Sequence, residues 1–154
     1  MSKKFKQQEI SLDPIYNDIL VSRFINQIMR NGKKSLARRI VYSAFEQIKK
    51  ETKKDPLEVF KKALGVAKPT VEVKPRRVGG ATYQVPKEVG EKRGVSLAIR
   101  WLVAAAKAKK KGTMGEKLSQ EIILAFKNEG EVIRKKTNLY KMAEANKAFA
   151  YLKR

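Results

Sequence analysis

Apolar residues recur at helical spacing along most of the chain. Asp13 followed by Pro14 is typical of a helix start, because an aspartate caps free backbone N–H groups and a proline at the first helical position loses no hydrogen bond. Asp55 and Pro56 repeat this signal. Apolar side chains recur at helical spacing in six segments, which we predict to be helices. They cover residues 14–29, 33–50, 56–67, 94–111, 114–128 and 132–151.

The helices are expected to differ in how many of their apolar side chains are buried in the core. The second is predicted to bury Leu36, Ile40, Val41, Ala44 and Ile48. Apolar residues surround the fourth helix, with Arg100 the only charge among them, so this helix is expected to be central and mostly buried, and its Trp101 to be a core residue. The last helix is expected to be irregular over residues 135–138, with Asn146 a satisfied polar group in a helix interface. Glu46, Glu58 and Glu121 are expected on solvated helix faces.

The apolar period changes from 3.6 to 2 between residues 70 and 90. Two alternating segments, Val71–Val78 and Ala81–Val89, flank Gly79 and Gly80, a pair suited to the positive φ angles of a two-residue hairpin turn. The register then pairs Arg76 with Tyr83, Lys74 with Val85, Glu72 with Lys87 and Arg77 with Thr82. Each strand contains a proline, which cannot donate to a ladder. We therefore expect an isolated ribbon that protrudes and is ordered by something it binds.

Composition points to a polyanionic partner. The chain has 154 residues, of which 42% are hydrophobic, so one domain can form a core without metal or disulfide bonds. Lys and Arg number 36 against 15 Asp and Glu, a formal net charge of +21. Such self-repulsion opposes a compact monomer, and nucleic acid phosphates would screen it.

The sequence lacks the residues of most catalytic and metal sites. It has no cysteine and no histidine, and therefore no disulfide, no thiolate ligand and no usual general base. Gly79 and Gly80 lack the lysine and hydroxyl of a phosphate-binding P-loop. No segment reaches the length of a signal peptide or a membrane span. We expect a cytoplasmic protein without catalytic residues, metal, cofactor or membrane partner.

Cationic residues crowd onto the hairpin and the residues after it. They are Lys74, Arg76, Arg77, Lys87, Lys92 and Arg93. Tyr83, the only aromatic residue of the hairpin, is expected beside Arg76. Phosphate contacts from the cations and stacking from the tyrosine are what an RNA-binding arm needs. The alternative is that Tyr83 covers the cross-strand pair and that the charges protect an exposed edge from aggregation.

Two further basic clusters are candidate RNA contacts. One comprises Lys33, Lys34, Arg38, Arg39 and Tyr42, and the other Lys107, Lys109, Lys110 and Lys111. A solvated helix face is the competing interpretation for the first cluster. A favourable interaction with the helix dipole is the competing interpretation for the second.

Seven strings together have the spacing of one known family. They are residues 31–34 (NGKK), 40–44 (IVYSA), 68–74 (KPTVEVK), 76–80 (RRVGG), 82–86 (TYQVP), 98–101 (AIRW) and 142–150 (MAEANKAFA). They resemble the seventh protein of the bacterial small ribosomal subunit, and the resemblance extends from Leu12 to Ala150. The tail uses lysines where relatives often carry arginines, and residues 151–154 depart from the usual aromatic ending.

The pattern and the resemblance agree on the architecture. They predict a mainly α protein in which a six-helix, bundle-like body, residues 13–68 and 93–154, carries a protruding two-stranded β-hairpin arm, residues 70–90. A basic tail, residues 1–12, completes the single RNA-binding domain. The resemblance implies a structural protein of the ribosome that binds the 3′ major domain of small-subunit ribosomal RNA and nucleates head assembly. It also implies a place at the subunit interface near the decoding centre, with the arm beside the exit-site tRNA and with the ninth and eleventh small-subunit proteins as neighbours.

The residues expected to touch RNA come from both arguments. The resemblance assigns this role to Lys3, Lys4, Lys6, Lys33, Lys34, Lys74, Arg76, Arg77 and Tyr83. The charge pattern adds Arg38, Lys92, Arg93, Lys109 and Lys110.

Three other functions compete at this point. An architectural DNA-binding protein could also clasp a duplex with a basic arm, although such proteins are usually smaller obligate dimers. A membrane-surface protein is disfavoured because the apolar stripes match one another in number and width. An RNA-modifying enzyme is the third alternative.

Overall fold

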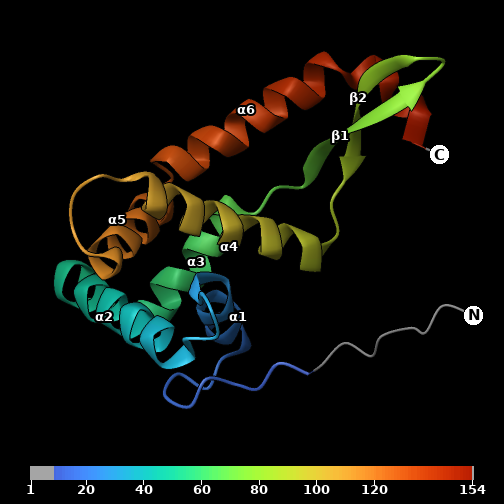
Figure 1. Ribbon diagram of the computed structural model, residues 1–154. Coiled ribbons are helices and arrows are strands. Elements are labelled where there is room, and N and C mark those ends of the chain that lie inside the picture. The colour runs from blue at the N-terminus through green and yellow to red at the C-terminus, as the bar shows by residue number, and fades with distance from the viewer. Residues whose placement is uncertain (1–8, 154) are drawn as a thin grey trace, which may run out of the picture.

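The computed structural model describes residues 9–153, which form a helical body and a β-hairpin arm (Figure 1). The helices are α1 Ile19–Ile28, α2 Lys34–Thr52, α3 Pro56–Ala67, α4 Glu91–Ala108, α5 Met114–Phe126 and α6 Glu131–Ala145. The strands are β1 Val71–Val78 and β2 Ala81–Glu88, and a 3-10 helix, η1 Lys147–Lys153, follows α6. The predicted fold class is confirmed.

Three phenylalanine rings form the centre of the body. Phe24 of α1, Phe45 of α2 and Phe60 of α3 are fully buried. The Phe60 ring lies 4.9 Å from the Phe24 ring and 5.4 Å from the Phe45 ring, between centroids. Apolar residues of α4 and α5 and Val132 of α6 complete this core. All six α-helices of the described residues thus contribute to one packed interior.

The first helix begins later than the sequence predicted. Asp18, not Asp13, caps α1, because its carboxylate accepts hydrogen bonds from the backbone of Leu20 and Val21. Asp13 caps a separate turn by accepting from Ile15 and Tyr16. The prediction of a helix from residue 14 was wrong because both aspartates are competent caps.

Three of the five residues predicted to be buried in the second helix are buried, namely Val41, Ala44 and Ile48, but the helix is rotated slightly from the predicted orientation. Leu36 is 45% exposed and Ile40 is only half-buried, whereas Ala37 and Phe45 are buried. Tyr42, expected on the outer face, is half-buried and donates a hydrogen bond to Asp13 Oδ1 at 2.8 Å. Burial and this hydrogen bond raise the pKa of Tyr42 to about 12.

The fourth helix is amphipathic rather than central. Its buried face includes Ala98, Ile99, Leu102, Val103 and Ala106. Arg100 is exposed. Ala104 is exposed too, because alanine has too little apolar surface to require burial. Trp101 packs against the core as expected, half-buried, with Lys135 Nζ 5.6 Å from its ring centroid.

The last helix breaks later than expected. No irregularity occurs at residues 135–138; α6 ends at Ala145, with Asn146 as its C-cap, and η1 begins at Lys147. The Asn146 amide donates to the Met142 carbonyl at 2.8 Å, so this side chain is satisfied within its own helix rather than across an interface.

The hairpin has the predicted register, but it is not isolated. Arg76 pairs with Tyr83 and Glu72 with Lys87, and the two turn glycines have φ angles of 56° and 86°. The end of α6 and η1 lie against the arm (Figure 1). Val85 and Pro86 of β2 are buried as a result. The chain's own C-terminal segment therefore provides the cover that the ribbon needs.

Candidate nucleic-acid interface

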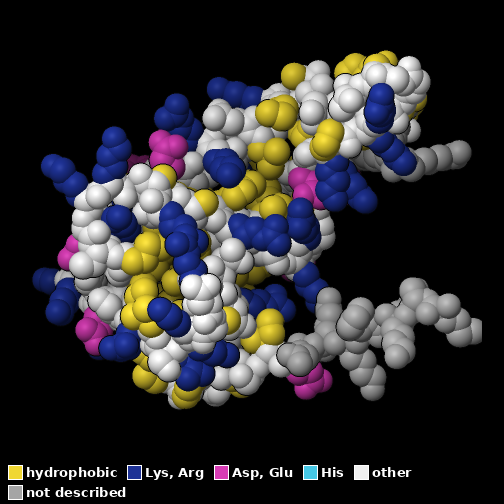
Figure 2. Space-filling model, in the orientation of Figure 1, with side chains coloured by type: hydrophobic (Ala, Val, Ile, Leu, Met, Phe, Trp, Pro, Cys, Tyr) yellow, Lys and Arg dark blue, Asp and Glu magenta, His cyan; other side chains and the backbone are white. Residues whose placement is uncertain are grey.

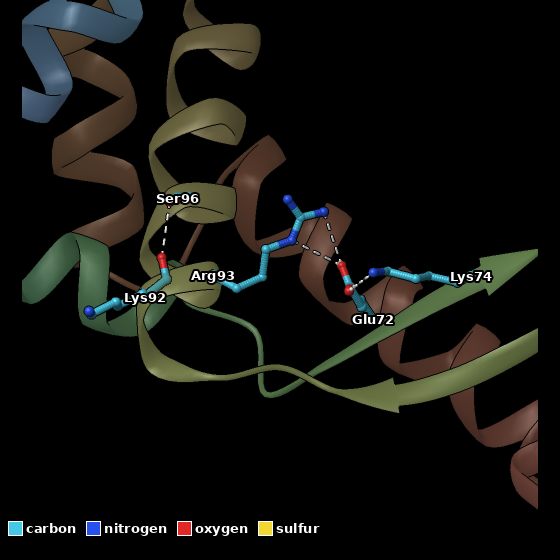
Figure 3. A network of polar contacts seen from close by, with 5 residues as sticks. All are labelled: Glu72, Lys74, Lys92, Arg93 and Ser96. Atoms are coloured by element: carbon cyan, nitrogen blue, oxygen red, sulfur yellow. Dashed lines mark hydrogen bonds and ion pairs between the residues drawn. The ribbon is translucent and has the colours of Figure 1, made fainter. Parts of the chain in front are cut away.

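Glu72 gathers two predicted RNA-binding residues at the base of the arm. Its carboxylate lies 2.9 Å from Lys74 Nζ on the same strand and 3.3 Å from an Arg93 guanidinium nitrogen in the first turn of α4. Figure 3 shows the carboxylate between these two cations. The pair with Arg93 connects the arm to the body, and both Lys74 and Arg93 have a structural partner before any RNA is bound.

Both cations favour the ionised form of Glu72. Burial alone would raise the pKa of this carboxyl, but the hydrogen bond from Lys74 and the nearby charge of Arg93 outweigh it. The pKa of Glu72 is therefore lowered below its ordinary value of 4.5. The carboxylate stays charged at neutral pH and holds the base of the arm against α4.

Further contacts brace the same region. The Thr70 backbone donates to the Tyr140 hydroxyl of α6 at 3.0 Å, and Lys68 pairs with Glu91 of α4 at 2.6 Å. Lys136 of α6 donates to the Val66 carbonyl at 2.6 Å. The arm thus leaves the body from a fixed base.

The arm presents several cations to solvent. Arg76 and Arg77, near the turn, and Lys87, opposite Glu72 at the base, are exposed. The Tyr83 ring is half-buried and packs against Phe149 of η1, with centroids 5.0 Å apart. This contact with η1 was not predicted from the sequence, and it limits the ring area left for a nucleobase.

Lys92 lies in a polar groove that sequence reasoning did not assemble. The groove has a volume of about 520 Å³ between α1 and α4. It is lined by Ile10, Arg23, Asn26, Gln27, Lys92, Ser96, Ile99 and Arg100. The helical wheel places Arg23 on the polar face of its helix, but it does not show that this face meets Arg100. The structure thus adds Arg23 and Arg100 to the basic surface.

The cluster at the start of α2 is only partly exposed. Lys33 is exposed, and Lys34 and Arg38 are half-buried. The Nε of Arg38 is buried with no hydrogen-bond partner among the described residues. Lys33 lies across a groove from Lys107, so the structure brings two clusters that are separate in the sequence close together.

Lys109 and Glu121 form an ion pair that corrects the expected position of Glu121. The Glu121 side chain is 2% exposed, and its carboxylate lies 2.9 Å from Lys109 Nζ. Lys109 also donates to Gln120 at 3.1 Å. Glu121 therefore does not lie on a solvated face, whereas Glu46 and Glu58 do. Lys110, one residue on, is exposed.

Comparison with known proteins identifies the family. The family model described as ribosomal protein S7p/S5e matches residues 1–147. The chain belongs to this family. The small ribosomal subunit protein uS7 of Thermotoga neapolitana is 55% identical over 149 residues, which cover 97% of this chain and 96% of the relative. The proteins of the same name from Thermotoga maritima and Thermosipho africanus are 54% and 53% identical and cover 97% and 98% of this chain and 96% and 97% of their own lengths.

Membership of the S7p/S5e family confirms the resemblance found in the sequence. The protein is a structural, non-enzymatic component of the small subunit, and so of the bacterial ribosome in the cytoplasm. Binding to ribosomal RNA is general to the family. The family decides in favour of this interpretation over an architectural DNA-binding protein or an RNA-modifying enzyme.

The surface of this S7p/S5e protein is rich in cations. Figure 2 shows Lys and Arg side chains over the visible face of the body and beside the arm, with few acidic side chains among them. Within residues 9–153, no three His, Cys, Asp or Glu side chains cluster as a metal site requires, and no helix is long and apolar enough to span a membrane. The predicted contacts Lys3, Lys4 and Lys6 lie outside the described residues.

Proposed function

We propose that this S7p/S5e protein binds the 3′ major domain of small-subunit ribosomal RNA directly and nucleates assembly of the head. The observation that carries the proposal is that exposed cations of the arm and α4 occur with the half-buried Arg23 of α1 on a chain whose formal net charge is +21. Neutralising phosphates releases their counterions, which gives such a surface its affinity for folded RNA.

The proposed contacts differ in their exposure. Arg76, Arg77, Lys92, Lys33 and Lys110 have exposed side chains and are proposed to reach phosphates. Lys74, Arg93, Lys109 and Tyr83 have contacts within the fold and are proposed to meet RNA while keeping them. Lys34 and Arg38, both half-buried, are proposed contacts at the start of α2. Lys3, Lys4 and Lys6 remain proposed contacts from the sequence.

The arm supports a further proposal about the assembled subunit. It extends beyond the helical body with its turn farthest out (Figure 1). We infer that the arm reaches the exit-site tRNA near the decoding centre, at the subunit interface. The ninth and eleventh proteins of the small subunit are the proposed protein neighbours.

Filter binding to two RNA transcripts tests the main proposal. The chain is expected to bind a transcript of the 3′ major domain more tightly than one of the 5′ domain. Replacing Arg76 and Arg77 with glutamine should weaken the preferred complex roughly tenfold at moderate salt, because two phosphate contacts are lost. Lys49→Gln with Lys50→Gln is the matched control, since both lysines are exposed on α2 and the charge change is equal. Equal affinity for the two transcripts would overturn the proposal.

The tRNA proposal needs assembled subunits. Subunits reconstituted with the double arginine variant should retain less tRNA at the exit site than subunits with the lysine control variant. Equal retention by both would contradict a contact between the arm and tRNA while leaving ribosomal RNA binding intact.

A further inference from the structure

Glu72 is an acidic residue among the cations at the base of the arm. Its carboxylate pairs with Lys74 and Arg93, and Lys87 is its cross-strand partner. The Glu72 side chain is only 13% exposed, whereas the side chains of Lys74 and Arg93 are 53% and 45% exposed. The carboxylate is therefore covered, while both cations that pair with it keep part of their surface in solvent.

The ion pairs fix the direction of these two cations. Arg93 donates from Nε and Nη2 to one Glu72 oxygen, at 3.4 and 3.3 Å, and Lys74 Nζ lies 2.9 Å from the other oxygen. Because a guanidinium is a rigid planar fork, its remaining N–H groups then point in a fixed direction. Figure 3 shows Arg93 reaching towards Glu72 while the neighbouring Lys92 points away from it. Lys92 can follow a phosphate freely, whereas Lys74 and Arg93 cannot.

The start of α4 fixes the distance between Arg93 and the arm. A Cβ on Gly94 would lie 2.7 Å from Lys68 Cγ and 3.1 Å from the Pro69 carbonyl oxygen, so the chain just before β1 packs directly on the first turn of α4. Lys68 also pairs with Glu91 in that turn. The arrangement around Glu72 is therefore set by the fold before any RNA arrives.

Two directed cations with an anion between them can distinguish one polyanion from another. Phosphates that match the free donors can contact both cations without disturbing Glu72. Phosphates in another arrangement must break the ion pairs, and they then meet an uncovered carboxylate that repels them. Folded RNA and duplex DNA differ in the arrangement of their phosphates, since RNA helices are A-form and are joined by loops and bulges.

We propose that Glu72 is a specificity-determining residue for the RNA bound at the base of the arm. It directs Lys74 and Arg93 towards one arrangement of phosphates and repels other arrangements. The inference rests on the proposed binding to ribosomal RNA and deepens it, because it gives an acidic side chain a part in the choice of polyanion. Glu72 acts through the two cations, so it is a positioning residue.

Glu72→Gln tests this role, because glutamine has almost the size of glutamate but no charge. Filter binding of the full chain compares a transcript of the 3′ major domain with duplex DNA of equal length. The variant should bind the DNA about fivefold more tightly, since a local repulsion is removed. The slope of log affinity against log salt for the DNA should steepen by about 0.9, because one more phosphate is neutralised. Affinity for the transcript should change little, because the lost repulsion and the lost orientation oppose each other.

Glu91→Gln is the matched control. It makes the same change of charge and also breaks an ion pair between the start of α4 and the chain before the arm, but its partner Lys68 is not a proposed RNA contact. This variant should keep the preference of the unmodified chain for the transcript. Circular dichroism of both variants checks that they fold.

The ratio of the two affinities decides the outcome. An unchanged ratio with Glu72→Gln, or an equal fall with Glu91→Gln, would overturn the inference, because Glu72 would then only brace the arm. In either case a preference of the unmodified chain for the transcript would show that the proposed function still stands. If the unmodified chain has no such preference, the proposed function is contradicted together with the inference.

Discussion

Lys109 and Lys110 are adjacent in the chain and carry the same charge, yet their surroundings differ. Lys109 lies against the buried carboxylate of Glu121, whereas Lys110 is exposed. When its cation is removed, a buried carboxylate is left with a desolvation cost that no ion pair offsets. At the scale of single residues, the position of a lysine therefore decides whether it serves the fold or is free to meet RNA.

Replacing each of these lysines with alanine separates the two roles. Lys109→Ala should lower the free energy of unfolding by about 2–3 kcal/mol, because Glu121 is left charged and buried. Lys110→Ala should change it by less than about 0.5 kcal/mol. Urea denaturation followed by circular dichroism measures both values. A loss of equal size for the two variants would contradict the structural role of Lys109.

Glu72 makes the stability of the chain depend on pH. Glu72→Gln should lower the free energy of unfolding by about 0.5–1 kcal/mol near neutral pH, a small effect because Lys74 and Arg93 are half exposed. The pKa of Glu72 is lowered in the folded chain, so its contribution is complete above 4.5 and is lost as the pH falls through the lowered value.

Denaturation of the two proteins across this pH range checks the prediction. The difference in unfolding free energy between the unmodified chain and Glu72→Gln should shrink as the pH falls below 4.5. Glu88→Gln is the matched control on the same arm, since Glu88 is exposed. A difference that persists in strong acid would show that the ion pairs are not its source.

Residue types alone could not reveal these pairings. Glu121 follows Lys109 by twelve positions, and a loop that includes Gly112 separates them. A helical wheel treats each helix alone, so it placed Glu121 in solvent. The direction in which the loop returns depends on the packing of α5 against α4, which local pattern does not encode.

The arm shows what pattern can and cannot predict at the scale of elements. Two glycines at a two-residue turn determine the register, so the pairing was predictable to the residue. The packing of η1 against the arm was not predictable, because η1 follows the arm by almost sixty residues and its contact with Tyr83 is a tertiary one. A two-stranded ribbon is marginal alone, and the contact with η1 supplies the missing packing.

Helix ends were harder to predict than helix existence. Asp13 and Asp18 both cap turns, and only Asp18 begins α1. The apolar stripe of α2 allowed two helix rotations, one burying Leu36 and one burying Phe45. Packing against Phe60 selected the second. The exposed Leu36 then became part of a groove that the sequence did not suggest.

Removing the Phe149 ring tests whether η1 holds the arm in place. Phe149→Ala should leave the helical circular dichroism almost unchanged and increase hydrogen exchange of the β1 and β2 amides, because Tyr83 loses its partner. Tyr151→Ala is the control, since Tyr151 is 77% exposed. Exchange that increases equally in both variants would contradict a specific role for Phe149.

Charge is the property that belongs to the molecule as a whole. A net charge of +21 on 154 residues was evident from composition and pointed to a polyanion at once. The family then specified which polyanion, since S7p/S5e proteins are ribosomal. Composition could not provide the arrangement, in which Arg23 of α1 and Lys92 and Arg100 of α4 line one groove.

Competition between ribosomal RNA and duplex DNA across a salt series tests the central claim most directly. Affinity for a transcript of the 3′ major domain should fall by roughly 10³ to 10⁵ between about 50 and 200 mM salt, if about six to ten phosphates are neutralised. At every salt concentration the transcript should displace duplex DNA of equal length. A flat salt profile, or equal competition by the DNA, would contradict the claim that this basic surface is built for folded ribosomal RNA.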